Sequence, residues 1–326
     1  MRVMQLLGRD SLILTPSDLA GFAECGHLVT LEIETARGLR KRTVRDDPQL
    51  DLIREKGGEF EARQLAAFEA EGKRVVSFER PGSSAEALSA AQEATLAAMK
   101  GGADVIYQGT FFDGRWRGHP DFLLRVEAPS TALGAWSYEV ADSKLARHAK
   151  PSALLQLCFY TEALGLLQGL APPTMHLILG DGKRQSHRVA DYVAYYRALK
   201  RRFEERTDPT PVAEATYPEP VDHCRICNWY PDCAERRRKD DHLSRVAGIR
   251  STQVECLKAG GLPTLTSLGK CEANVRPIDI GPKPFDRLHN QARLQLDQYA
   301  DSIVRYELIP PDTEGLQKGL ALLPEP

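Results

Sequence analysis

Two carboxylates and a lysine in the middle of the chain have the types and spacing that metal-assisted phosphodiester hydrolysis needs. Asp142 and Lys144 are two residues apart at the end of a strand-like stretch, 135–144, so the alternation of side chains along a strand puts both on one face. Asp121 lies in the preceding strand-like stretch, 116–126, and a turn would bring it opposite them. Two carboxylates can hold Mg²⁺ or Mn²⁺, while a lysine orients or helps deprotonate the attacking water and steadies charge on the phosphate.

A lone Asp-x-Lys is weak evidence for catalysis, because strands often end in charged residues. Here Gly118 stands three residues before Asp121, and Gln156 and Tyr160 follow in a helical stretch. The i, i+4 spacing of the last two places both side chains on one face of that helix. The chain therefore offers a candidate site assembled from three consecutive segments.

Seven cysteines are unusual for a reducing compartment, and three of them, Cys224, Cys227 and Cys233, form a C-x2-C-x5-C run. In a cytosolic chain such a run favours a metal or a cluster over a disulfide, since the two-residue spacing lets both thiolates of a turn point at one centre. One ligand is missing, and Cys25 is the preferred candidate because it ends an expected capped helix. The other candidates are Cys158, Cys256, Cys271 and His223.

Three short motifs, in order along the chain, resemble the late motifs of the RecB-type nucleases of the PD-(D/E)xK superfamily. They are Gly118-x-x-Asp121, Asp142-Ser143-Lys144 and Gln156-x-x-x-Tyr160. The cysteine pattern, with Cys25 before the core and the triple after it, resembles the iron–sulfur branch of that family. This branch includes the AddB nuclease domain and the CRISPR-adaptation exonucleases. The resemblance implies that Gln156 and Tyr160 contact DNA or orient the site.

The resemblance also implies a role for each residue of the two strand motifs. Asp121 and Asp142 would be metal ligands, and Lys144 would be the catalytic lysine. The backbone carbonyl of Ser143 would be a further metal ligand. These roles agree with the chemistry that the residue types suggest on their own.

The first motif of the family is a helix that carries a His or an acidic metal ligand after a Gly, and residues 55–64 occupy its place. Phe60 stands where many relatives have His. This departure leaves Glu61, or alternatively Glu59, as the remaining acidic ligand. The residues alone also allow both glutamates to face solvent on an ordinary helix.

In the iron–sulfur branch, four cysteines hold a 4Fe-4S cluster, and the matching residues here are Cys25, Cys224, Cys227 and Cys233. Four thiolates also suit a structural Zn²⁺, and spacing alone does not separate the two. Zinc ribbons usually come as two C-x2-C pairs, whereas the resemblance assigns one distant cysteine and a compact triple to iron and sulfur. We therefore expect the cluster, with zinc as the alternative, in a structural role that adds binding to folding free energy.

The elements around these residues alternate between helix and strand. Helices are expected over 84–100, 151–169 and 191–206, and further strands over 105–112, 175–179 and 186–189. This order predicts an α/β fold, a restriction-endonuclease-like mixed sheet flanked by helices, for a nuclease domain over residues 1–240.

After Asp241 the character of the sequence changes. Residues 243–250, followed by 254–268, resemble a helix-hairpin-helix repeat, whose glycine turns can present backbone N–H groups to DNA phosphates. Arg250 stands where a DNA-binding hairpin usually has a second Gly, so packing is the alternative role of this turn.

A helix is expected over 286–299 and a strand over 302–308, which makes 241–326 a small, mainly helical domain with a C-terminal extension. Relatives that resemble this whole layout often continue into a ribonuclease H-like exonuclease domain. The resemblance therefore implies that the chain is the N-terminal part of a longer protein.

Composition excludes several classes. At 326 residues and 42% hydrophobic content the chain can bury a core, which excludes disorder, collagen and coiled coil as global descriptions. No uncharged apolar run reaches the roughly 18 residues of a membrane span, and the N-terminus lacks signal-peptide features, so we expect a cytoplasmic protein without membrane contact. The net charge of −2 does not indicate a polyanion binder, although basic clusters at 37–45, 200–202 and 236–239 could touch phosphates.

The sequence therefore predicts a Mg²⁺- or Mn²⁺-dependent deoxyribonuclease, an exonuclease on single strands or DNA ends, in DNA repair or processing. Expected partners are DNA and either a helicase or a further C-terminal nuclease domain. One alternative is a noncatalytic nucleic-acid-binding or scaffold module with a decayed site, suggested by Phe60 and the net charge. The other is a zinc-stapled protein whose Asp-x-Lys is accidental.

Overall fold

The structure is a computed structural model that describes residues 4–7, 11–43, 45–208, 216–272 and 275–308. Its contacts divide the chain into two units, Met1–Tyr230 and Pro231–Pro326. The expected boundary followed residue 240. The difference corresponds to α7 (Tyr230–Lys239), a continuous helix that falls almost entirely in the second unit.

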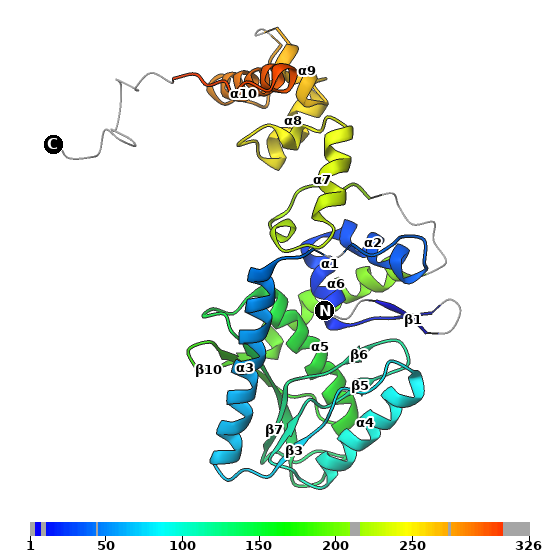
Figure 1. Cartoon of the computed structure of the whole chain (residues 1–326). Helices are drawn as coiled ribbons and strands as arrows, with labels where there is room; N and C mark the ends of the chain where they lie inside the picture. Colours follow the sequence, from blue (N-terminus) through cyan, green and yellow to red (C-terminus); the bar gives the residue numbers. More distant parts are fainter. Residues whose placement is uncertain (1–3, 8–10, 44, 209–215, 273–274, 309–326) are drawn as a thin grey trace, which may run out of the picture. The chain divides into compact units, whose positions relative to one another are not determined.

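Six strands form the central sheet of the first unit, in the order β10-β9-β8-β7-β4-β3 (Figure 1). The sheet is mixed, because β8 pairs with β9 and β3 with β4 in parallel, while the other neighbours are antiparallel. The strands are β3 (Val75–Ser77), β4 (Val105–Tyr107), β7 (Phe122–Val126), β8 (Ser137–Lys144), β9 (Thr174–Leu179) and β10 (Arg184–Arg188).

Helices cover both faces of this sheet, as the expected α/β class requires. On one face lies α3 (Pro48–Ala70) (Figure 1). Its Phe60 packs against sheet residues such as Phe122 and Ala141. The other face carries the larger core, to which α4 (Ala85–Lys100) contributes Met99 and α5 (Pro151–Gln168) contributes Leu157. The remaining helical elements of the unit are α1 (Pro16–Glu24), α2 (Gly26–Ala36), α6 (Val193–Thr207) and the 3₁₀ turns η1 (Val189–Asp191) and η2 (Asp222–Arg225).

Local sequence signals explain where the main helices begin and end. Ser84 caps α4, because its hydroxyl accepts a hydrogen bond from Ala87 N at 3.2 Å. Pro151 occupies the first turn of α5, and Gly169 ends that helix with a φ of +67°. The expected helices over 84–100, 151–169 and 191–206 are therefore confirmed to within two residues.

The expected strand over 105–112 is wrong as a single element. It breaks after β4 because Gln108 has a φ of +55°, a left-handed conformation that extended strands do not adopt. Beyond the break, β5 (Phe111–Phe112) pairs with β6 (Arg117–Gly118) in a separate two-stranded sheet, so the expected strand 116–126 is also divided. A second small sheet, β1 (Gln5–Leu7) with β2 (Ser11–Ile13), was not expected from the sequence.

The second unit is helical, as expected. It contains α7, η3 (Leu243–Arg245), α8 (Ser251–Ala259), α9 (Leu265–Lys270) and α10 (Pro282–Asp301). Leu257, Leu265 and Phe285 lie in one buried apolar cluster that joins the last three helices.

The expected strand over 302–308 is wrong, because these residues have no regular secondary structure. Ser302 ends this helix with a φ of +61°, and the next charged side chains return to it. Arg305 donates to Asp301 at 2.7 Å, and Glu307 pairs with Arg293. This segment therefore contacts α10 through ion pairs and does not pair with a neighbouring strand.

Among the residues that the structure describes, none of the helices is long and apolar enough to cross a membrane.

Candidate active site

The two carboxylates of the strand motifs lie side by side at the ends of β7 and β8. Antiparallel pairing sets Phe122 opposite Ala141, which brings the preceding Asp121 next to Asp142. Asp121 is only 8% exposed and Asp142 3% exposed. Both the backbone N–H and the hydroxyl of Ser143 donate to Oδ2 of Asp121, each at 2.8 Å. Ser143 thus fixes the orientation of Asp121, a contact that the sequence did not suggest.

Lys144 and Asp142 point the same way, as the alternation along the strand predicts. The Lys144 ammonium forms an ion pair with Oδ2 of Asp142, and the lysine side chain remains one-third exposed. Burial alone would lower the pKa of Lys144, but the carboxylates of Asp142 and Asp121 outweigh it and raise the pKa. Lys144 is therefore a protonated ammonium at the solvent-facing side of the cluster.

The third carboxylate is Glu61, and α3 delivers it. Phe60 is buried in the apolar cluster under the sheet, so the next side chain turns toward the strand ends. There the Gln108 amide donates to Glu61, and Glu61 also hydrogen-bonds the hydroxyl of Tyr107. Glu59 instead lies exposed and pairs with Lys56 at 2.8 Å. Of the two glutamates, the structure brings Glu61 to the site.

Three neighbouring acids and one lysine leave an excess of negative charge. Burial raises the pKa of Asp142 to about 7, the Asp121 carboxylate adds to the rise, and the Lys144 ammonium opposes it. Burial and Asp121 likewise raise the pKa of Glu61. Buried carboxylates of this kind gain by pairing with a cation. The oxygen donors and their unbalanced charge fit Mg²⁺ or Mn²⁺.

The side chains that the structure describes are not arranged as a complete metal-ligand set. Within the residues that the structure describes, no group of three or more His, Cys, Asp or Glu side chains is arranged to hold a metal ion. Lys144 itself takes the position against Asp142. The carboxylate donor set fits a divalent cation by its chemistry, and the described side-chain positions do not surround one.

Tyr160 of the last motif also reaches this cluster. It is buried on α5, where burial and then the charges of Asp142 and Asp121 raise its pKa well above the usual value. Gly118 is required by the same packing. A Cβ atom on Gly118 would lie 2.7 Å from ring carbons of both Phe159 and Tyr160, so no larger residue fits there without displacing them.

Gln156 does not join the carboxylates. Its amide donates to the hydroxyl of Ser17 in α1 at 3.2 Å. It lines a separate cavity of about 530 Å³, with Asp18, Lys150 and Arg225 among the other lining residues. Both residues lie in α5, as expected, yet only Tyr160 of the pair lies at the site.

Two residues at the site, Gln108 and Arg80, were not expected from the sequence. Gln108 lies between Glu61 and Arg80, because its amide donates to the first and accepts from Arg80 Nε at 3.1 Å. The only local signal was the pair Gln108-Gly109 at the end of a strand. Nothing in the sequence around Arg80 indicated a role.

Three of the four cysteines of the iron–sulfur pattern gather within the first unit. Cys25 lies between α1 and α2, Cys224 belongs to η2, and Cys227 follows it. Burial raises the pKa of Cys227, and the neighbouring Cys224 and Cys25 add to the rise. Cys233 lies in α7 and belongs to the second unit. Within the residues that the structure describes, none of the cysteines takes part in a disulfide.

In the segment that resembles a helix-hairpin-helix, three backbone donors between η3 and α8 are occupied. Ile249 N donates to Val246 O at 3.2 Å, and Arg250 N donates to the Gln253 side chain at 2.9 Å. Ala247 N donates to a glutamine of α10 at 2.9 Å. These contacts agree with the packing alternative for this turn.

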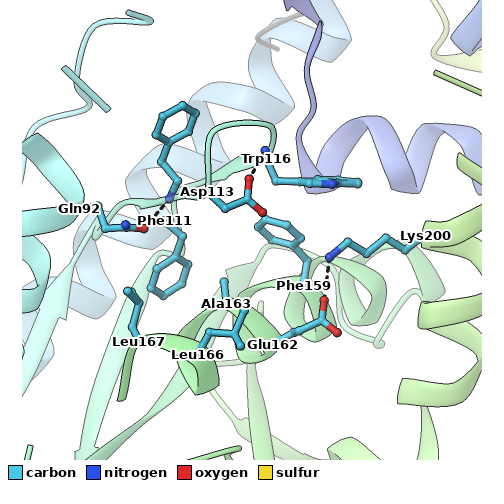
Figure 2. Close-up of a pocket in the computed structure, with 11 residues that line it drawn as sticks. Gln92, Phe111, Asp113, Trp116, Phe159, Glu162, Ala163, Leu166, Leu167 and Lys200 are labelled. Atoms are coloured by element: carbon cyan, nitrogen blue, oxygen red, sulfur yellow. Dashed lines mark hydrogen bonds and ion pairs between the residues drawn. The ribbon is translucent and has the colours of Figure 1, made fainter. Parts of the chain in front are cut away.

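An apolar cavity of about 240 Å³ lies on another side of α5 (Figure 2). Its walls include Phe111, Trp116 and Phe159, and none of the carboxylates of the cluster lines it. Two of its charged side chains pair, since Lys200 lies 2.8 Å from Glu162, and Asp113 accepts hydrogen bonds from the backbone N–H groups of Arg115 and Trp116. This cavity offers no convergent polar groups for chemistry, so the carboxylate cluster remains the candidate active site.

A comparison with protein-family models finds no match for this chain, and a comparison with curated proteins finds none either. The case for a function therefore rests on the residues and their geometry.

Proposed function

We propose that the protein is a Mg²⁺- or Mn²⁺-dependent deoxyribonuclease that hydrolyses phosphodiester bonds in single strands or at DNA ends. The observation that carries this proposal is the cluster of Glu61, Asp121 and Asp142 with Lys144 at the ends of two paired strands. The mixed sheet with helices on both faces supports a restriction-endonuclease-like arrangement of the first unit.

Each residue of the cluster has a defined part in such a reaction. Asp121, held by Ser143, together with Asp142 and Glu61 would hold the ion, which supplies positive charge to polarise the phosphodiester and to acidify the attacking water. Lys144 donates hydrogen bonds and can orient that water or stabilise charge on the phosphate. The burial of both aspartates strengthens these interactions, because little solvent screens them.

We further propose that Cys25, Cys224, Cys227 and Cys233 hold a 4Fe-4S cluster with a structural role, and zinc is the competing occupant. The Cys25 and Cys224 thiols are within electrostatic reach of Cys227, which supports a metal centre shared by these residues. Gln156 lines the cavity beside α1. Its proposed role is contact with a DNA strand that passes through this cavity, one helical turn from Tyr160.

The test is degradation of end-labelled single- and double-stranded DNA with Mg²⁺, Mn²⁺ or EDTA. Wild-type protein purified without oxygen is compared with Lys144→Ala and with the exposed control Lys183→Ala. We expect metal-dependent cleavage that falls at least a hundredfold in Lys144→Ala and persists in the control. Equal cleavage by both variants would exclude Lys144 as the catalytic lysine and overturn the proposed site. No cleavage by a folded wild type that still binds DNA would leave a noncatalytic binding module.

A further inference from the structure

Gln108 combines an unfavourable backbone conformation with almost complete burial. Its φ is +55° although it is not a glycine, and its side chain is 5% exposed. Non-glycine residues rarely adopt this region, and they keep it only where surrounding contacts impose it. At this position the chain leaves β4 and passes the candidate active site.

The contacts that hold Gln108 come from three separate segments of the site. Its backbone N–H donates to Asp121 O at 2.9 Å, its amide N–H donates to Glu61, and its amide oxygen accepts from Arg80 Nε at 3.1 Å. One residue therefore joins α3, the start of β7 and the segment after β3. Both ends of the amide are used, so a shorter or apolar side chain could not replace it.

Arg80 is the one of these partners that faces solvent. It uses Nε on Gln108, and it forms no ion pair with any residue that the structure describes. Its charge opposes the rise in the pKa of Glu61 and of Tyr160 that burial causes, which places the guanidinium within electrostatic reach of the cluster. An exposed guanidinium beside buried carboxylates, with its terminal nitrogens free of carboxylate partners, is suited to a bidentate phosphate contact.

We propose that Arg80 binds a phosphate of the nucleic-acid substrate next to the cleaved bond, and that Gln108 is the positioning residue that fixes Arg80 and Glu61 relative to each other. This inference rests on the proposed nuclease function. It explains why a strained glutamine stands where a glycine would be the easier choice: glycine would adopt the backbone but lose both amide contacts.

Gln108→Gly separates positioning from a structural role. The variant keeps the left-handed backbone, so we expect an unchanged or higher Tm. We also expect at least a tenfold weaker affinity for Mn²⁺, measured by electron paramagnetic resonance of the free ion, and a kcat lowered at least tenfold. An unchanged Mn²⁺ affinity and kcat, or a Tm that falls together with activity, would overturn the positioning role.

Arg80 is tested by binding as well as by turnover. Fluorescence anisotropy with labelled single-stranded DNA, in Ca²⁺ to prevent cleavage, should show at least tenfold weaker binding for Arg80→Ala, with Arg80→Lys intermediate. The matched control is Arg184→Ala, an exposed arginine on the edge strand β10, which should bind as the wild type does. KM should rise more than kcat falls.

The two proposals fail in different ways. If the wild type cleaves DNA and Lys144→Ala does not, but Arg80→Ala binds and cleaves normally, the phosphate contact is wrong and the nuclease stands. If the wild type does not cleave, but Arg80→Ala still weakens DNA binding tenfold, the nuclease is wrong and the phosphate contact stands.

Discussion

At the scale of single residues, the candidate site contains ionisable carboxyl groups that are largely shielded from solvent. Asp121 and Asp142 are both buried, and only Lys144 and the nearby Arg80 offset them and Glu61. A protein keeps such a cluster at a cost in stability, because burial disfavours the ionised carboxylates. That cost has a measurable pH dependence.

Asp142→Asn should stabilise the metal-free protein at pH 8 while abolishing nuclease activity. The pKa of Asp142, about 7 in the folded protein, lies above the ordinary 3.8, so its protonated form is favoured by folding. Stability from this group is fully present below pH 3.8 and is lost as the pH rises through 7. We expect the variant to gain on the order of 1 to 3 kcal/mol at pH 8 in EDTA, measured by urea denaturation.

The control for this experiment is Asp181→Asn, an exposed carboxylate whose pKa is lowered by the backbone N–H of Lys183. Like the wild type, this variant should lose free energy of unfolding as the pH rises from 5 to 8. A wild type whose stability rises across that range would contradict the argument. Addition of Mg²⁺ at pH 8 should raise the wild-type Tm and leave Asp142→Asn nearly unchanged, since binding to the folded state stabilises it.

Gly118→Ala should damage the site through packing rather than charge. The added methyl group would meet the rings of Phe159 and Tyr160 at 2.7 Å, and overpacking of this kind costs about 1 to 3 kcal/mol. The free energy of unfolding, measured by urea denaturation, and kcat are both expected to fall. The control Gly57→Ala meets nothing within 4 Å in α3 and should be neutral or stabilising, because alanine favours a helix. Equal behaviour of the two variants would exclude the steric explanation.

At the scale of elements, α3 decides which acidic residue reaches the site. Phe60 anchors the helix by packing under Phe122 and Ala141, and this contact sets the rotation that aims Glu61 at the strand ends. The phenylalanine at the position where many RecB-type nucleases have His therefore has a packing role in this chain. Its consequence for function can be tested directly.

Phe60→His should lower stability without improving metal binding. The side chain of residue 60 is 4% exposed and lies in an apolar cluster, so a buried imidazole would lack hydrogen-bond partners there. We expect a loss of about 2 kcal/mol or more in the free energy of unfolding, with Mn²⁺ affinity and kcat no higher than in the wild type. Phe60→Leu, which keeps the site apolar, should cost less. A gain of metal affinity in Phe60→His would show that this position faces the carboxylates.

At the scale of the whole molecule, the cysteines of the proposed metal centre lie in segments that are far apart in sequence. Cys25 follows the first helix, whereas Cys224 and Cys227 lie near the end of the first unit. A metal centre here would add its binding free energy to folding, since the unfolded chain holds no such site. The whole fold should therefore depend on these thiols.

Cys224→Ser should reduce bound metal and lower the Tm of protein purified without oxygen. Iron, sulfide and zinc analysis of the wild type identifies the occupant: iron with sulfide and a visible absorption band supports the cluster, and stoichiometric zinc supports the alternative. Cys158→Ser is the control, because Cys158 is buried in the core near Met175 and should leave metal content unchanged. A wild type without iron or zinc, as stable as Cys224→Ser, would contradict a metal centre.

Sequence periodicity determined much of this protein. Capping residues and apolar spacing located α4, α5 and α6, and alternation along β8 placed Asp142 and Lys144 on one face, because these patterns depend on neighbours in the chain. Tertiary structure decided the rest. Gln108 broke a strand and linked Arg80 to Glu61, and Gln156 paired with Ser17 of α1. Those outcomes depend on contacts between distant segments, which no local pattern encodes.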